Sequence, residues 1–189
     1  MDFRYIIIGI NVLVFILQQF FPGIDYMYSN NVLAILGGEY WRLLTAGFLH
    51  GSLPHLFGNM WMLNITGKMI EKRYGGHKFL LMYLLSIIAG SVFSFLYNYM
   101  NKAFYVIALG ASGGVFGLVG GIAGFYWVNR DDVFLKKTLG SWLAEIIVIN
   151  VGFAFIDPNI DWMAHVGGFI MGYIVARIFE KKKRSDFVY

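Results

Sequence analysis

Ser112 and His165 are the two residues whose types and surroundings could support nucleophilic catalysis. A serine hydroxyl becomes a nucleophile when a base removes its proton, and histidine, with a pKa of about 6.5, suits that task near neutral pH. Ser112 stands in Gly-x-Ser-Gly before an apolar run, so its own backbone N–H at a helix start could stabilise an oxyanion. The plainer interpretations are a serine that caps a helix and a histidine that hydrogen-bonds between helices.

Glycines predict how these two side chains could meet. Residues spaced by four lie on one face of a helix, and glycines there leave bare backbone that a second helix can approach closely. If two such faces pack in parallel, the hydroxyl and the imidazole lie at the same depth. The glycines are Gly113, Gly117 and Gly121 after the serine, and Gly168 and Gly172 after the histidine.

A third group of polar residues begins the second apolar stretch. His55 and Asn59 are four apart and share a helix face, and His50 lies just before them. Neutral imidazole and amide donors can stabilise negative charge as it forms, as an oxyanion hole does. The plainer interpretations are helix packing for Asn59 and a loop hydrogen bond for His50. A metal site from His50, His55 and His165 is a further alternative, but it lacks a supporting carboxylate or a His-Glu-x-x-His helix, so we expect no metal and no cofactor.

Composition places the chain in lipid. It is 58% hydrophobic and 14% charged, with a mean hydropathy of +0.63, whereas soluble proteins have about 25% charged residues. The 23 glycines suit packed membrane helices. The absence of cysteine excludes disulfides and cysteine nucleophiles. The net charge of +4 comes from basic residues at helix ends, so no nucleic-acid partner is expected.

The apolar runs predict an all-α, polytopic membrane protein, a single domain over 1–189 with six transmembrane helices. The first run is expected to be a retained anchor, because its flank is weakly basic and no small-residue cleavage site follows. The fourth helix is short, roughly 27 Å, so its start should lie below the membrane surface, behind a non-helical stretch over 103–111. The helices are predicted at 5–21, 53–70, 79–100, 112–129, 138–156 and 161–179, with a long outer loop over 22–52 and a basic tail over 180–189.

The distribution of basic residues predicts the orientation. All of the 15 Lys and Arg residues except Arg42 and Lys102 fall on one side of the predicted spans. The positive-inside rule therefore places both termini in the cytoplasm. The long loop, Ser112 and His165 then face the outer side.

Two carboxylates have alternative interpretations. Glu145 lies inside the fifth span, where it could contact a proton or substrate, but pairing with another helix or reaching the cytoplasmic surface is the preferred interpretation. Asp161 lies one turn before His165 and could orient it as a third catalytic group. Its place at the edge of a loop favours a helix cap instead.

The pattern as a whole resembles the rhomboid intramembrane serine proteases, and the resemblance covers nearly the whole chain. Each motif is weak alone, but their order on these spans is highly specific. The motifs are Glu39-Tyr40-Trp41-Arg42, His50 with His55-x-x-x-Asn59, Glu71-Lys72-Arg73-Tyr74-Gly75, Gly110-Ala111-Ser112-Gly113 and Ala164-His165-x-x-Gly168-x-x-x-Gly172.

This resemblance implies a rhomboid-like bundle with a dyad in which Ser112 is the nucleophile and His165 the base. It implies an oxyanion site from His55, Asn59 and the Ser112 backbone, and no third acid. It also implies a first loop partly in the membrane and a substrate gate at helix five and the loop before helix six. The chain departs from the family at Phe116, where many relatives carry a tyrosine stacked on the histidine; a phenyl ring can still stack but has no hydroxyl.

The expected function is therefore hydrolysis of a peptide bond in a transmembrane protein substrate, near its outer end. The chain resembles the minimal bacterial form, without a sizeable soluble domain or a seventh span, and is expected in a bacterial cytoplasmic membrane. The main alternative is a catalytically inactive relative that binds transmembrane helices. A small transporter is disfavoured, since no internal repeat is visible. The substrate and the oligomeric state are left open.

Overall fold

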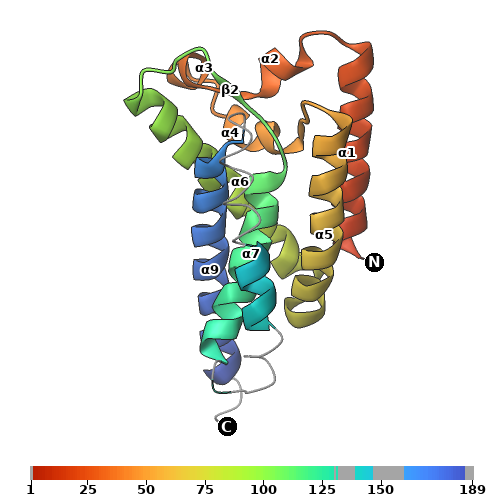
Figure 1. Ribbon diagram of the computed structural model, residues 1–189, viewed down its shortest axis with the longest axis vertical. Helices are drawn as coiled ribbons and strands as arrows, with labels where there is room; N and C mark the ends of the chain where they lie inside the picture. Colours follow the sequence, from red (N-terminus) through yellow and green to blue (C-terminus); the bar gives the residue numbers. More distant parts are fainter. Residues whose placement is uncertain (1, 130, 132–138, 147–159, 186–189) are drawn as a thin grey trace.

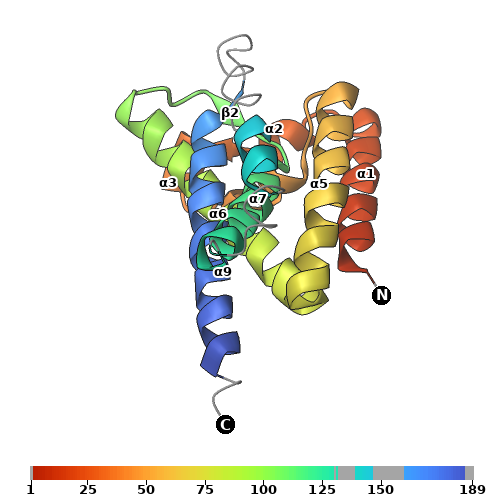
Figure 2. The same ribbon diagram turned by 60° about the horizontal axis from the view of Figure 1, so that its bottom comes forward.

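Long helices dominate the computed structural model, which describes residues 2–129, 131, 139–146 and 160–185. They are α1 (Phe3–Phe20), α5 (Leu53–Tyr74), α6 (Gly76–Met100), α7 (Ser112–Val128) and α9 (Trp162–Ser185). Residues 139–146 form a further helical segment. In both ribbon views α7 lies in the middle of the bundle, packed against α5, α6 and α9, while α1 lies beside α5 (Figures 1 and 2). The predicted all-α class is confirmed.

Three of the predicted helix bounds differ from the structure. The helix predicted over 79–100 begins at Gly76. The helix predicted over 53–70 continues to Tyr74 and stops at Gly75, whose φ of 84° is a backbone conformation that glycine adopts readily. The last helix does not end at 179 but continues to Ser185, so the first part of the predicted tail over 180–189 is helical. In the helix predicted over 138–156, residues 138 and 147–156 lie outside the described residues.

Three of the described helices are long and apolar enough to cross a membrane. They are α1, α6 and the part of α9 from Trp162 to Glu180. The central helix α7 is apolar but has 17 residues, or roughly 26 Å. Glycines let it sit in the middle: a methyl group added to Gly114 would lie 2.5 Å from the ring of Tyr83 on α6, and one on Gly117 would overlap the Ser86 side chain.

The segment over 22–52 is folded into short elements rather than left as an irregular loop. It contains α2 (Ile24–Tyr28), β1 (Asn30–Asn31), α3 (Val32–Leu36), α4 (Arg42–Thr45) and the 3-10 turn η1 (Ala46–Phe48). These elements gather at one end of the bundle (Figure 1).

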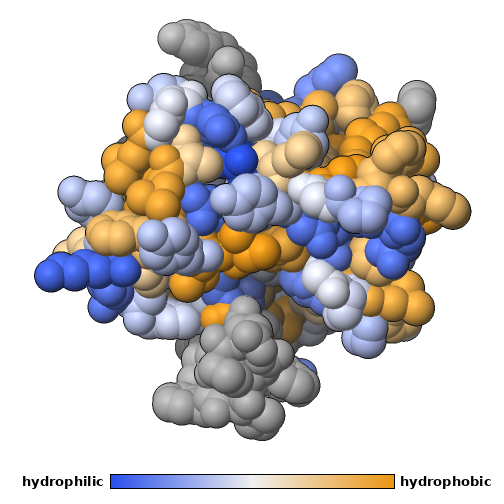
Figure 3. Space-filling view, turned by 90° about the horizontal axis from the view of Figure 1, so that it is seen from above, coloured by the Kyte–Doolittle hydropathy of each residue, from blue (hydrophilic) through white to orange (hydrophobic). Residues whose placement is uncertain are grey.

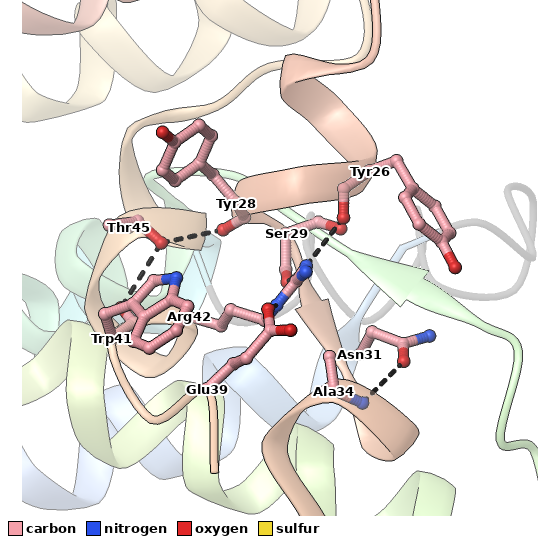
Figure 4. Close-up of polar contacts among 9 residues, drawn as sticks. All are labelled: Tyr26, Tyr28, Ser29, Asn31, Ala34, Glu39, Trp41, Arg42 and Thr45. Atoms are coloured by element: carbon pink, nitrogen blue, oxygen red, sulfur yellow. Dashed lines mark hydrogen bonds and ion pairs between the residues drawn. The ribbon is translucent and has the colours of Figure 1, made fainter. Parts of the chain in front are cut away.

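Arg42 holds this segment together. Its buried guanidinium donates to Glu39 Oε2 at 2.6 Å and to the carbonyl oxygens of Tyr26 and Ser29 at 2.6 and 3.1 Å (Figure 4). The Thr45 hydroxyl adds a bond of 2.8 Å to the carbonyl of Tyr28. One planar cation with five N–H groups thus binds the partly exposed Glu39 carboxylate and two backbone carbonyls.

A short antiparallel pair then joins this segment to the stretch that leads into α7. In β1 and β2 (Ile107–Ala108), Asn30 pairs with Ala108 and Asn31 with Ile107. The Asn30 amide also donates to the carbonyl of Ser91 on α6 at 2.7 Å. The non-helical stretch before Ser112 is thus tied to the 22–52 segment through these pairs, while Tyr105, Val106 and Ile107 remain exposed.

Ion pairs join the helices at the opposite end of the bundle. Arg4 on α1 pairs with Glu71 on α5 at 2.7 Å, and Arg73 on α5 pairs with Glu180 on α9 at 2.8 Å. Viewed from the end that carries the 22–52 segment, the surface is a mosaic of hydrophilic and hydrophobic residues (Figure 3). Tyr40 and Trp41 are both exposed on this segment, as expected for rings in a headgroup region.

Candidate active site

Helices α7 and α9 touch backbone to backbone along their glycines. A methyl group added to Gly168 would overlap the carbonyl oxygen of Gly113, and one added to Gly172 would overlap the carbonyl oxygen of Gly117. Gly120 meets the carbonyl of Phe169 in the same way. The glycine faces predicted around Gly113, Gly117, Gly168 and Gly172 therefore do face each other, since no side chain separates them. The prediction was wrong for Gly121, where an added methyl group would meet Met82 on α6 and Ile70 on α5.

Ser112 is the first residue of α7, and Ala111 occupies the N-cap position. The plainer interpretation of Ser112 as the capping residue was therefore wrong. Gly110, two residues earlier, has a φ of 135°, a backbone conformation open to glycine alone among ordinary residues. The sharp turn at Gly110 places the hydroxyl of Ser112 at the N-terminal end of a helix, where backbone N–H groups have no partner within the helix.

His165 lies on the first turns of α9 and stacks on Phe116. Their ring centroids are 4.1 Å apart and their planes differ by 8°. Phe116 follows Ser112 by four residues, so both lie on the same face of α7. His165 therefore covers the face of α7 that carries Ser112. The Phe116 ring stacks on the imidazole although it lacks the hydroxyl that a tyrosine would carry.

His55 reaches the same place from α5. A Cβ added to Gly110 would lie 2.8 Å from His55 Cε1 and 3.7 Å from Ser112 Oγ, so imidazole and hydroxyl flank the same point of the backbone. The Asn59 amide donates to the carbonyl of His55 at 3.1 Å, one turn back in its own helix. Its NH₂ group carries a second hydrogen that this bond does not use.

A small pocket lined by both polar and apolar residues opens beside Ser112. It has about 20 Å³ of water-accessible space, enough for one water molecule. Its lining includes Asn30, Ser91, Ser94, Ser112 and Asp161. Asp161 is a helix cap: its Oδ1 accepts the backbone N–H of Ala164 at 3.0 Å.

The remaining predicted residues have other surroundings. His50 is almost fully buried and meets the His55 ring edge to face at 5.1 Å. Burial, and then the charge of His55, lower the pKa of His50 to about 3, so this ring is neutral at ordinary pH. Glu39 and Arg42 organise the 22–52 segment, and Glu145 is exposed on the segment 139–146. Among the described residues no three His, Asp or Glu side chains converge as metal ligands would.

The sequence analysis missed Gln18, whose side chain binds the backbone of His50 from α1. A signal was present: Arg4, Asn11 and Gln18 recur every seven residues on an otherwise apolar helix. A spacing of seven keeps residues on one helix face. Polar residues repeated on one face of an apolar helix indicate the side that meets other protein rather than lipid.

The fold and this site define a helical, multi-pass membrane protein with a serine and a histidine between glycine-lined helices. Comparison with known proteins gives the family: the rhomboid domain model matches residues 37–182, and the chain belongs to the rhomboid family. It is embedded in the membrane and crosses it more than once, as its family and its apolar helices require.

Individual relatives carry the same family name. The chain is 36% identical to rhomboid protease GluP of Bacillus subtilis over 98% of its own length and 36% of that protein. It is 36% identical to RHOMBOID-like protein 4 of Arabidopsis thaliana, over 75% of this chain and 34% of that one. It is 30% identical to putative rhomboid protease YdcA of Bacillus subtilis, over 82% of this chain and 75% of that one. The chain thus spans only about a third of the length of the first two.

Proposed function

We propose that this protein is an intramembrane serine protease that cleaves transmembrane segments of other membrane proteins near their outer ends. The observation that carries the proposal is the contact of α7 and α9 through bare glycine backbone, with Ser112 at the start of one helix and His165 stacked one turn away over Phe116. The names of GluP and YdcA as rhomboid proteases support the same activity.

In this mechanism His165 takes the proton of the Ser112 hydroxyl as its oxygen attacks the scissile carbonyl carbon. The negative charge that forms on the carbonyl oxygen is stabilised by the Ser112 backbone N–H at the helix start, and by donors from His55 and Asn59. His165 then gives the proton to the leaving amine, and the peptide bond breaks to leave an ester on the serine.

Water completes the cycle by hydrolysing this ester, with His165 again acting as the base. The pocket beside Ser112 has room for one such molecule. The substrate segment must unwind before it reacts, because the carbonyl groups of an intact helix are hydrogen-bonded within it. Small or helix-weakening residues near the cleaved bond are therefore expected.

The proposal includes six transmembrane spans, with both termini in the cytoplasm of a bacterial cell and the site open to the outer side. The positive-inside distribution of lysine and arginine supports this orientation. Helix α7, short for a membrane span, fits a start below the outer surface.

Cleavage of a panel of single-span membrane proteins by the purified chain, with products mapped by mass spectrometry, tests the proposal. Ser112→Ala is expected to abolish cleavage and to leave the thermal unfolding midpoint nearly unchanged. A fluorophosphonate probe is expected to label Ser112 in the unaltered chain and not in His165→Ala. Cleavage retained by Ser112→Ala would refute the assignment of the nucleophile. A folded chain that binds these segments without cutting any would point to the inactive, helix-binding alternative.

A further inference from the structure

We propose that Gln18 on α1 is a positioning residue for this protease site, an inference that rests on the function proposed above. The Gln18 carboxamide meets the main chain of His50 twice. Its Nε2 donates to the carbonyl of His50 at 3.1 Å, and its Oε1 accepts the backbone N–H of His50 at 3.1 Å. One side chain thereby makes the pair of bonds that a neighbouring strand would make with that residue.

The same amide also binds α2. Gln18 Nε2 donates to Asp25 Oδ1, a hydrogen bond to an ionisable acid that is stronger than a neutral one when the acid is charged. The two hydrogens of the NH₂ group and the carbonyl oxygen are then all used, which fixes the rotation of the amide. Gln18 therefore joins three separate parts of the chain: α1, α2 and the turn before α5.

From His50 the contacts lead directly to the reacting groups. Its buried ring packs against His55, and His55 lies over Gly110, two residues before Ser112. The two residues between His50 and the first residue of α5 are Gly51 and Ser52, both exposed. Since packing gives this short link little support, the backbone position of His50 sets where α5 begins and where His55 points.

The neighbouring Gln19 provides a matched comparison. Gln18 is half-buried and continues the inner face of α1 that holds Arg4 and Asn11, whereas Gln19 is exposed. The Gln19 amide donates at 3.2 Å to the carbonyl of Phe15, within its own helix. Two adjacent residues of the same type thus differ in burial and in their attachment to the site.

The experiment uses the full chain in lipid vesicles with a single-span substrate that the unaltered chain cleaves. Gln18→Leu is expected to lower kcat about tenfold or more and to leave KM within about twofold, because a misplaced oxyanion donor weakens transition-state binding only. The rate at which the fluorophosphonate labels Ser112 should fall in parallel. Gln19→Leu is expected to retain the kcat, KM and labelling rate of the unaltered chain.

A second pair of variants tests the hydrogen bonds themselves. Gln18→Glu keeps an acceptor for the His50 N–H but loses the NH₂ donor and sets a carboxylate against Asp25. Adding Asp25→Asn supplies a donor from the other side, so the double variant is expected to recover several-fold of the kcat that Gln18→Glu loses. A residue needed for folding alone would lower the unfolding midpoint without this recovery.

Each failure has its own signature. If the unaltered, folded chain neither cleaves nor becomes labelled, the proposed function fails, and the positioning role with it. If the unaltered chain is active and Gln18→Leu matches Gln19→Leu in kcat, only the positioning role is refuted. If Gln18→Leu does not fold, the second pair of variants decides. A double variant with Gln18→Glu and Asp25→Asn whose kcat is no higher than that of Gln18→Glu alone would refute the positioning role. ¹⁵N-histidine spectra of the 4 histidines give a readout without turnover: the His50 amide resonance should shift in Gln18→Leu and not in Gln19→Leu.

Discussion

Replacing Gly168 with alanine tests the helix contact on which the proposed dyad depends. A Cβ at this position would overlap the carbonyl oxygen of Gly113, far inside the 3.0 Å that real Cβ atoms keep from other atoms. Backbone cannot rotate aside as a side chain can, so α7 and α9 must separate by roughly 1 Å. That separation would move His165 away from Ser112.

The size of the effect follows from this displacement. Overpacking costs about 1–3 kcal/mol of stability, and the higher helix propensity of alanine offsets up to about 1 kcal/mol of it. Catalysis should suffer more, because a misplacement of about 1 Å can lower the rate by about a hundredfold. We therefore expect Gly168→Ala to remain folded and to lose most of its kcat.

The assay compares cleavage rates and thermal unfolding midpoints of Gly168→Ala and Gly9→Ala in the same vesicles. Gly9 lies on α1 with no atom within 4 Å of an added Cβ, so the same substitution there should change neither quantity by much. A Gly168→Ala variant as active as Gly9→Ala would refute the reasoning, since the two helices would then not need their close approach for catalysis.

Two further predictions follow from the ring stack and from the buried guanidinium. Phe116→Ala should lower kcat about three- to tenfold, because the stack on His165 contributes about 0.5–1.5 kcal/mol. Phe116→Tyr keeps the ring and should retain activity. Equal cleavage rates for Phe116→Ala and the unaltered chain would contradict this prediction. Arg42→Met should lower the free energy of unfolding by about 2–3 kcal/mol through the carbonyls and acid it leaves without a partner. Glu39→Gln should lower the free energy of unfolding by less than about 1 kcal/mol in the same denaturation assay, since its carboxylate is 39% exposed. A larger loss for Glu39→Gln than for Arg42→Met would count against a central role of the guanidinium.

The sequence by itself determined the class of the protein and the family to which it belongs. Apolar runs without charge can form only helices in lipid, so composition alone implies an all-α bundle. The glycines spaced by four predicted the contact of Gly113 and Gly117 with Gly168 and Gly172, because spacing along a helix maps onto one face, but not the position of Gly121 against α5 and α6. Asp161 as a helix cap was also correctly preferred, since its position at a helix edge is a local property.

Helix ends were harder to predict. An apolar run ends where the chain leaves the membrane, but the helix itself can continue into the polar residues that follow. Glu71, Arg73 and Glu180 looked like parts of polar ends, yet they lie within helices and pair across the bundle. Partners of this kind are distant in sequence, and no periodicity in either helix identifies them. The fold of the 22–52 segment around Arg42 has the same origin.

Only the tertiary structure decided how the residues expected around Ser112 contact one another and what holds them in place. The approach of His55 to Gly110, the stack of His165 on Phe116 and the bond from Gln18 to His50 each join residues from different helices or segments. Sequence spacing fixes the direction of a side chain within its own helix, but the relative placement of helices depends on how all their surfaces pack together. In this protein that placement is set by glycine backbone on α7 and α9, and by polar side chains that tie the outer segments to them.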